Sequence, residues 1–427
     1  MVTALFASSS AATSEPDHQL DEERCRAVIT FVSDLIEQKY VDPEVGSKAI
    51  AVLRGNLDQG DYCASSNPRD LAGALTADLS PFDRHFHVFW TPADSGPPPG
   101  AHGEEADSAW LELSRIQNFG FEQVARLPGN LGYLDLRYFD NVELGGSTAV
   151  AAMAFLAHTD AVIVDLRQNG GGEPAMVQLL ASYFFGPERV HYNSFYSRGS
   201  DSLEQYWTLA RVEGDRMPEV PLYILTARRT GSAAEGFSYA LQALERATII
   251  GQPTAGAAHP GETFDAIEGF SIFISTGKPV NPVTGSNWEK TGVQPDIEID
   301  ADEALDRARV LALEELLQAA ASPVVTLERE WALEAILALR DPHLLAPEQS
   351  VDYVGSYGNR DVSEQEGHLF YRRGDRRSYE MVFLGDDRFL LDGKSGFRLE
   401  FERDADGSIV RLLDHWSDGH VEANTRD

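Results

Sequence analysis

The sequence predicts an α/β protein in which a small helical domain precedes the core and an antiparallel β module follows it. Apolar residues recur at helical spacing from about Leu20 to Leu79. Between residues 132 and 320, continuous apolar runs alternate with helical patterns, which is typical of a sheet with substantial parallel pairing. After Pro323, short β segments separated by turn signals indicate an antiparallel meander.

The composition is that of a globular protein with an unusual charge. The chain has 427 residues, 43% of them hydrophobic and 24% charged, which is enough for two or three domains. Its formal net charge is −33. Such a field repels nucleic acids and anionic membrane surfaces, so neither is expected as a partner. No run is long and apolar enough to span a bilayer, so membrane insertion is not expected either.

Two short features leave alternatives open. The cysteines Cys25 and Cys63 fit no metal motif, so they form either one disulfide or two inert thiols. The N-terminal residues 1–7, followed by serine and alanine, are similar to the end of a secretory signal but have no basic region before them. This segment indicates either a periplasmic or secreted protein or a disordered arm.

The N-terminal region is predicted to hold three helices and a strand. The apolar faces of the helices are formed by Val28, Phe31, Val32, Leu35 and Ile36, by Ala49, Ile50, Val52 and Leu53, and by Leu71, Leu75 and Leu79. A strand is predicted at 86–90, and the proline-rich segment 91–107 is predicted to be a loop or linker. Residues 18–90 therefore form a predicted N-terminal domain.

The core is predicted from buried strands that alternate with helices. Its predicted strands are 132–136, 161–166, 222–226, 247–251 and 270–275, and its predicted helices are 148–158, 176–185, 232–244 and 303–320. The run 161–166 is almost entirely apolar, as a strand with both faces buried requires. The core domain is expected to span residues 106–320.

The C-terminal region has the short strands of an antiparallel module. A helix at 331–339 is followed by predicted strands at 353–357, 369–372, 379–384, 388–391 and 398–401. Turn signals at 385–387 and 404–407 separate some of them. We expect residues 325–427 to form a separate domain, and this domain carries no catalytic signature.

Ser232 stands where a predicted strand turns into a helix. The strand 222–226 ends, Gly231 supplies a turn, and Ser232 begins the next helix. A nucleophile gains from this place because its hydroxyl projects from the sheet edge, and free amides at the helix start can stabilise an oxyanion. The alternative is a structural cap, in which Ser232 and Glu235 form a capping box. The local sequence does not separate the two.

A glycine-rich turn follows the buried strand 161–166. Its residues, Asp165-Leu166-Arg167-Gln168-Asn169-Gly170-Gly171-Gly172, allow backbone amides to approach an oxyanion or a phosphate closely. Contiguous glycines are neither a dinucleotide fingerprint nor a P-loop, so no nucleotide cofactor is expected. The alternative is a flexible loop between a strand and a helix.

Two histidines and a glutamate complete the candidate set. His85 and His87 stand at alternate positions and share one face of an extended segment, a spacing that suits a metal or a general base. No third ligand stands out, so no metal site is predicted. Glu289, in Asn287-Trp288-Glu289-Lys290, is by itself typical of a solvated carboxylate in a loop.

Taken in order, these stretches resemble the tail-specific (C-terminal processing) protease superfamily of serine peptidases, family S41. The resemblance is to the branch that contains the tricorn protease core and the modules of interphotoreceptor retinoid-binding protein, and it covers roughly residues 20–317. The stretches 118–121, 127–134 and 254–260 support it. It implies a ClpP/crotonase-like α/β core behind a small helical domain, and a peptide or protein substrate.

The resemblance also implies a catalytic group. By position, Ser232 corresponds to the family nucleophile, His85 to the histidine of the tricorn-like branch, and Glu289 to the carboxylate that supports it, directly or through an intermediary. His87 and His259 also lie near family motifs and remain alternatives to His85.

Three backbone amides correspond to the family's oxyanion hole. They are those of Gly170, Gly171 and Ala233. Together with the serine, they imply peptide hydrolysis through an acyl-enzyme, without a cofactor or a metal.

The chain departs from the family at two places. The processing proteases pair the serine with a lysine in a Thr-x-Gly-Lys-Gly stretch, whereas this chain has Thr254-Ala255-Gly256-Ala257. Ala257 excludes a lysine dyad at its usual place, and Lys278 and Lys290 are poorly positioned substitutes. No PDZ segment is recognisable, so recognition of C-terminal tails is not implied.

Two other functions fit the same core. One is a non-catalytic protein that binds apolar, retinoid-like or lipid-like ligands, as the retinoid-binding modules do. The other is an esterase or amidase that acts on small substrates. Retention of Ser232, His85 and Glu289 together favours the peptidase. The oligomeric state is not indicated by the sequence.

Overall fold

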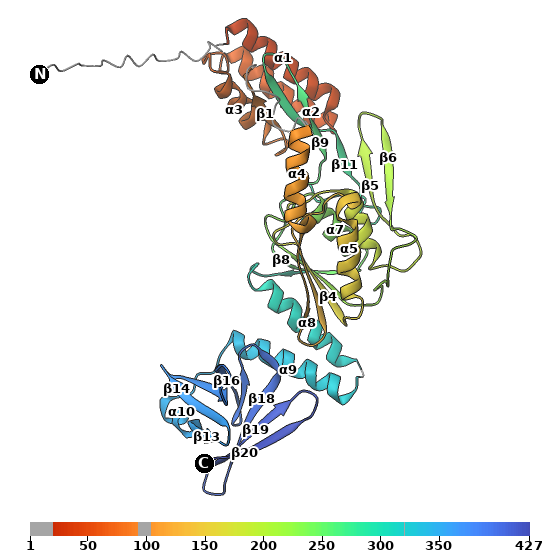
Figure 1. Cartoon of the computed structure of the whole chain (residues 1–427). Helices are drawn as coiled ribbons and strands as arrows, with labels where there is room; N and C mark the ends of the chain where they lie inside the picture. The colour runs from red at the N-terminus through yellow and green to blue at the C-terminus, as the bar shows by residue number, and fades with distance from the viewer. Residues whose placement is uncertain (1–19, 93–103, 320) are drawn as a thin grey trace, which may run out of the picture. The chain divides into compact units, whose positions relative to one another are not determined.

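The computed structural model describes residues 20–92, 104–319 and 321–427 (Figure 1). The signal-like residues 1–7 lie outside this range. The chain divides into two compact units. The first contains the described residues up to Leu111 together with Asn193–Tyr206 and Ala257–Lys290, and the second contains the described residues of Glu112–Tyr192, Trp207–Gly256 and Thr291–Asp427.

Three helices form the start of the first unit, as the sequence predicts. They are α1 (Glu22–Lys39), α2 (Pro43–Gln59) and α3 (Pro68–Leu79), drawn at the red end of the colour scale in Figure 1. Before each helix, a side chain accepts a hydrogen bond from an amide of the first turn: Asp21, Asp42 and Asn67. The first residue of α2 and of α3 is proline, which costs nothing there because that amide has no intrahelical acceptor.

A three-stranded antiparallel sheet belongs to the same unit. Its order is β1 (His87–Trp90), β10 (Phe270–Ser275) and β9 (Gly261–Asp265). Val88 pairs with Ile272, and both join the core formed by the three helices. The prediction that residues 270–275 close the parallel series is wrong. A middle strand of this sheet is buried along most of its length, so its apolar pattern is the same as that of a central parallel strand.

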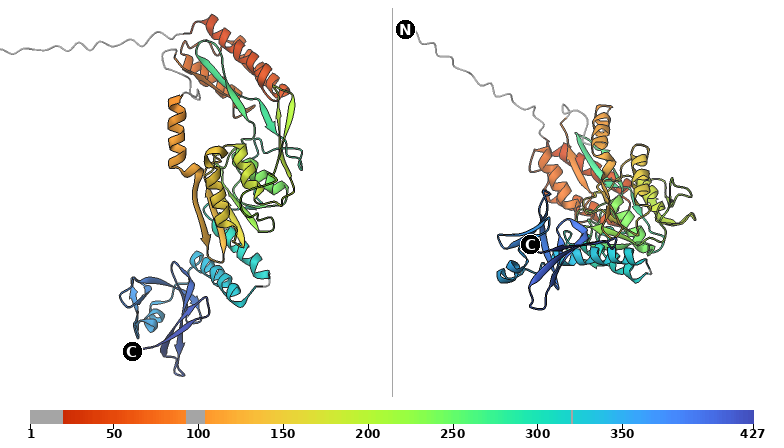
Figure 2. Two further views of the ribbon diagram at one scale, coloured as in Figure 1. Left: turned by 45° about the vertical axis from the view of Figure 1, so that its right-hand side comes forward. Right: turned by 60° about the horizontal axis from the view of Figure 1, so that its bottom comes forward.

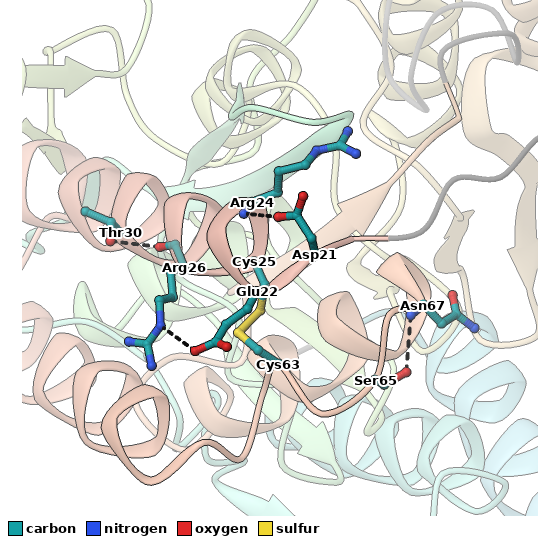
Figure 3. The surroundings of a disulfide bond; sticks show 9 residues. All are labelled: Asp21, Glu22, Arg24, Cys25, Arg26, Thr30, Cys63, Ser65 and Asn67. Atoms are coloured by element: carbon teal, nitrogen blue, oxygen red, sulfur yellow. Dashed lines mark hydrogen bonds and ion pairs between the residues drawn. A yellow bond between two sulfur atoms is a disulfide. The ribbon is translucent and has the colours of Figure 1, made fainter.

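A disulfide between Cys25 and Cys63 ties α1 to the segment between α2 and α3 (Figure 3). The two Cα atoms are 5.9 Å apart, and 38 positions separate the residues in the chain. Of the two alternatives that the sequence leaves open, the structure thus has the disulfide and not the two free thiols. Structural disulfides of this kind persist in oxidising compartments.

We expect loss of this disulfide to destabilise the helical region. The bond closes a loop of 38 residues, and a loop of this size contributes about 3 kcal/mol by restricting the unfolded chain. The double variant Cys25→Ala/Cys63→Ala should therefore unfold at a lower urea concentration than the wild type. Reductant should lower the midpoint of the wild type and leave the variant unchanged. Equal midpoints for wild type and variant without reductant would contradict the prediction.

The second unit is built on a six-stranded sheet. Its order is β12 (Ile297–Glu298), β8 (Thr248–Gly251), β7 (Leu222–Thr226), β4 (Ala161–Asp165), β3 (Leu131–Leu136) and β2 (Phe121–Leu127). All neighbours are parallel except β2 and β3. The predicted parallel pairing of the core is confirmed.

Helices cover this sheet and explain its apolar strands. Ile163 and Leu225 pack in one cluster with residues of α8 (Ala304–Gln318) and α9 (Pro323–Arg340). The alternate residues Val162, Val164 and Ile224 are buried too, so the other face is also covered. The unit's remaining crossover helices are α5 (Val142–Leu156), α6 (Pro174–Ser182) and α7 (Ala233–Ala243).

The C-terminal residues form an eight-stranded antiparallel meander, shown in blue in Figure 2. After α10 (Pro347–Tyr353), its strands run in chain order: β13 (Gly355–Tyr357), β14 (Arg360–Gln365), β15 (His368–Arg373), β16 (Tyr379–Gly385), β17 (Arg388–Leu391), β18 (Lys394–Arg403), β19 (Ile409–Trp416) and β20 (Val421–Thr425). A bridge between Tyr357 and Arg426 brings the two edges together, so the sheet nearly closes into a barrel. The predicted antiparallel module is confirmed.

The remaining elements join these parts. They are α4 (Glu104–Ile116), the short helix η1 (Asn118–Gly120), and the strands β11 (Gly277–Pro279), β5 (His191–Ser197) and β6 (Ser202–Trp207), which form a sheet in that order. Helix α4 begins inside the segment 91–107, which the sequence predicts to be a linker. The domain boundaries 18–90, 106–320 and 325–427 stay predictions. Within the described residues, no helix has the length and apolarity to cross a membrane.

Candidate active site

Ser232 lies in the second unit, at the corner where β7 gives way to α7. Its backbone has φ 51° and ψ −118°, the mirror image of extended backbone, which is costly for any residue except glycine. A helix N-cap normally has negative φ and accepts an amide hydrogen bond with its side chain. Ser232 has positive φ and its side chain makes no cap hydrogen bond, although its amide donates to the Glu235 side chain as in a capping box. The strained backbone therefore argues against the simple cap.

The corner is held by hydrogen bonds from both sides. The Thr230 hydroxyl donates to the Leu166 carbonyl (2.7 Å) and accepts from the Ala227 amide (3.0 Å). The Gly231 amide donates to the Asn169 carbonyl at 3.0 Å. The turn after β7 is thus fastened to the turn after β4, and these bonds oppose relaxation of the strained residue.

The glycine-rich turn comes directly against the serine. Buried Asn169 shapes it, because its side chain accepts from the Gly171 amide (2.8 Å) and donates to the Leu136 carbonyl (2.9 Å). Gly171 has φ 123°, and a Cβ there would lie 2.7 Å from the Cβ of Ser232. Only glycine permits this approach. The structure therefore brings the two sequence-predicted segments together within one unit.

Two of the three predicted oxyanion-hole amides are available. Among the described residues, the amides of Gly170 and Ala233 have no hydrogen-bond acceptor, whereas that of Gly171 is held by Asn169. Ala233 is also the first residue of α7, where the helix dipole adds positive potential. A Cβ on Gly171 would lie 3.2 Å from the Ala233 nitrogen, so the glycine turn borders this amide. Such donors can stabilise a developing oxyanion.

The fully buried Glu235 holds the backbone of Ser232 in place by hydrogen bonds. Its carboxylate accepts from the Ser232 amide (2.8 Å), the Thr254 hydroxyl (2.6 Å) and the Gly256 amide (2.6 Å). The sequence predicts Glu235 only as half of a capping box. Its further link to residues 254–256 depends on tertiary packing and has no local sequence signal.

The first unit holds the predicted His85 and Glu289, together with Asp83, which the sequence does not predict as a site residue. Asp83 is 1% exposed, and its Oδ1 accepts from both the His85 amide and the His85 ring nitrogen Nδ1, each at 2.8 Å. Its Oδ2 accepts from the Ser275 hydroxyl at 2.8 Å. This arrangement fixes the imidazole of His85 in one orientation. The sequence motif Asp83-Arg84-His85 contains the pair, but the spacing alone does not assign Asp83 this role.

The electrostatics of Asp83 agree with an ionised carboxylate. Burial alone would raise the pKa of Asp83, but the His259 and His85 imidazoles and the His85 amide outweigh it and hold this pKa well below its usual range. Burial, followed by the charge of Asp83, raises the pKa of the Tyr40 hydroxyl well above its ordinary value. A permanent negative charge is what a group that supports a protonated imidazole requires.

Glu289 lies in the same cluster but contacts other groups. Its Oε2 accepts from the Ala258 amide at 2.9 Å and is 3.9 Å from the His259 Nδ1. That nitrogen is 3.8 Å from Asp83 Oδ2, so His259 is close to both carboxylates without hydrogen-bonding either. Exposed His87 instead packs against Phe89 in a tilted arrangement, with ring centroids 4.3 Å apart. The described contacts therefore retain His85 and His259 as candidates for the base.

The cluster of Asp83, His85 and Glu289 has the ligand types of a metal site. Asp83, His85 and Glu289 each present a ligand atom, and these atoms lie within 4.8 Å of one another. The oxygens of Asp83 already accept three hydrogen bonds, and one oxygen of Glu289 accepts another. Groups engaged in this way suit the orientation of an imidazole better than coordination of an ion.

A stretch of the chain that includes residues of both units is similar to a known family. Residues 130–299 match the model of peptidase family S41. Over these residues, the chain is similar to the S41 peptidases. Ser232, the glycine turn and Glu289 lie inside the matched residues, whereas Asp83 and His85 precede them. The predictions of the family, and of a serine-type peptidase at the level of the family, are confirmed; the individual catalytic residues stay predictions.

Two relatives of the S41 domain are carboxyl-terminal-processing enzymes. The protease of Synechocystis sp. (strain ATCC 27184 / PCC 6803 / Kazusa) is 26% identical over 176 residues, which are 40% of this chain and 38% of that protein. The chloroplastic peptidase 1 of Arabidopsis thaliana is 24% identical over 255 residues, 56% of this chain and 48% of that protein. The chain thus spans less than half the length of either relative.

One solved structure carries the same fold. It comes from Parabacteroides merdae ATCC 43184 and matches with a TM-score of 0.51 and 18% identity, over 70% of this chain and 99% of that chain. At this identity the likeness concerns the fold alone. It agrees with the α/β architecture that the sequence predicts.

Proposed function

We propose that this chain is a serine peptidase in which Ser232 attacks the peptide carbonyl. The observation that carries the proposal is the strained Ser232 at the head of α7, bordered by the unpaired amides of Gly170 and Ala233. A cap would not require this backbone, whereas an exposed nucleophile beside an oxyanion hole would. The S41 match gives the reaction class.

In the proposed mechanism, His85 is the general base. Its Nδ1 is hydrogen-bonded to Asp83, and its Nε2 takes the hydroxyl proton as the Ser232 oxygen attacks. The resulting oxyanion accepts hydrogen bonds from the Gly170 and Ala233 amides. His85 then returns the proton to the leaving amine, and an acyl-enzyme remains. Water then hydrolyses this ester: His85 takes a proton from the water as it attacks the acyl carbonyl, and returns the proton to the Ser232 oxygen as the acid product leaves.

Two carboxylates support the imidazole in this proposal. Asp83 acts directly and fixes the tautomer through Nδ1, while Glu289 is a second negative charge in the same cluster. The sequence resemblance assigns the supporting role to Glu289, directly or through an intermediary. The 2.8 Å contact favours Asp83 as the immediate partner. Ala257, at the family's lysine position, is the reason for proposing a histidine rather than a lysine base.

A fluorophosphonate probe tests the proposal directly. We expect it to label the folded protein on the peptide that contains Ser232, because the probe reacts with activated serines and its phosphoryl oxygen would occupy the oxyanion hole. Heat-denatured protein should not be labelled, and a peptide library should compete for the site.

Other outcomes point to the competing functions. Folded protein that leaves Ser232 unlabelled would indicate a non-catalytic binding protein. Labelling with hydrolysis of small esters but of no peptide would indicate an esterase. The peptidase proposal requires both labelling and cleavage of peptides.

A further inference from the structure

The C-terminal barrel has a cavity at one of its ends. Its volume is about 420 Å³, and it is lined by residues from five strands and two turns. Arg373 ends β15, Tyr379 begins β16, Leu391 ends β17, Phe397 lies near the start of β18, and Trp416 ends β19. In a meander these strand ends share one end of the barrel. Mouths of β-barrels are common ligand sites, and this volume suits a small molecule.

The charge of this mouth is opposite to that of the chain. Its lining includes Arg373, Arg376, Arg377 and Lys394 and contains no carboxylate, although the chain has 68 acidic and 35 basic residues. Arg373 pairs with Glu422 at 3.0 Å. Within the described residues, the side chains of Arg376, Arg377 and Lys394 have no ion-pair partner. In a chain of net charge −33, three unpaired cations around one cavity are not explained by neutralisation of nearby acids.

The cations are organised around aromatic rings. Arg377 lies over the Tyr379 ring at 4.4 Å from its centroid, and Lys394 lies over the same ring at 5.3 Å. The Arg377 side chain lowers the pKa of the Tyr379 hydroxyl, which reports a positive potential at the mouth. Phe397 and Trp416 contact each other edge-on at 5.1 Å and supply an apolar wall.

We propose that the mouth of the C-terminal barrel binds a small organic anion that carries its charged group on an aromatic or apolar body. The charged group, a carboxylate or a phosphate, would accept hydrogen bonds from Arg376, Arg377 and Lys394. The body would pack on Phe397 and Trp416. This site is separate in the chain from Ser232 and does not depend on the proposed peptidase activity.

The test uses the full chain and three matched probes: 2-naphthoate, 2-naphthyl phosphate and the neutral 2-naphthamide. Calorimetric titration should give measurable binding of one or both anions, with an affinity that falls as salt is raised, and much weaker binding of the amide. Preference for the phosphate over the carboxylate, or the reverse, identifies the charged group. Equal binding of all three probes, or of none, would overturn the proposal.

Variants locate the site. Arg377→Gln/Lys394→Gln should weaken binding of the preferred anion about tenfold or more, because each charge-assisted hydrogen bond is worth at least that factor. Arg411→Gln is the control, since Arg411 is exposed on the same sheet and pairs with Glu402 outside the cavity. Ser232→Ala should bind the anion as the wild type does. An unchanged affinity in the double variant would overturn the assignment, and the salt dependence of the wild type decides the matter if that variant does not fold.

Discussion

Replacement of Ser232 by alanine is expected to abolish peptide hydrolysis and leave the fold intact. The loss of kcat/KM should be about 10⁴-fold or more, because the variant has no nucleophile and retains only binding and the oxyanion donors. The free energy of unfolding should change little, since the Ser232 side chain makes no cap hydrogen bond. Turnover of a fluorogenic peptide library and urea unfolding measure the two effects.

Replacement of the same residue by glycine separates catalysis from strain. Ser232→Gly should be as inactive as the alanine variant but more stable by about 1 kcal/mol, because glycine adopts φ 51° and ψ −118° without the steric cost paid by serine. The control is Ser238→Ala on the next turn of α7, where the hydroxyl only donates to the Ala234 carbonyl. Full activity in Ser232→Ala would refute the assignment of Ser232 as the nucleophile. If the glycine variant were less stable than the alanine variant, the proposed backbone strain at Ser232 would be refuted.

Much of the fold follows from local patterns in the sequence. The three N-terminal helices have clear apolar faces and Asp or Asn caps, and strands β4 and β7 are apolar because helices cover both sides of the sheet. Periodicity does not say which sheet a buried strand joins. Residues 270–275 pair with β1, far away in the chain, and only the tertiary register shows this.

The candidate site was predictable in its residue types but less so in its contacts. The turn at Gly170 and the corner at Ser232 carry strong local signals, because glycines and a strand-to-helix boundary are visible in sequence. The carboxylate partner of His85 has no such signal in the sequence. Asp83 and Glu289 are both acidic residues near a histidine, and the choice between them depends on which oxygen lies 2.8 Å from Nδ1.

Replacement of Asp83 by asparagine should reduce kcat strongly. The asparagine can present an N–H where the carboxylate accepts from His85 Nδ1, which favours the wrong tautomer of the imidazole, and a change of this type costs about 10⁴-fold in a Ser-His-Asp triad. KM should stay nearly unchanged, because Asp83 does not touch the substrate. The ¹⁵N shifts of the His85 ring should report the change of tautomer, which a merely structural role would not produce.

The comparison with Glu289→Gln decides which carboxylate orients the base. If Asp83 is the immediate partner, Glu289→Gln should lose much less activity than Asp83→Asn, because its 2.9 Å bond is to the Ala258 amide. Asp78→Asn is the matched control: this carboxylate is half-buried in the same unit and accepts from Tyr62 and Asn56, away from the cluster. The pKa of Asp83 is held well below its usual range, so Asp83 stays ionised down to about pH 4 and below, and a loss of activity near neutral pH would come from another group. A larger loss in Glu289→Gln, with Asp83→Asn folded and active, would return the orienting role to Glu289.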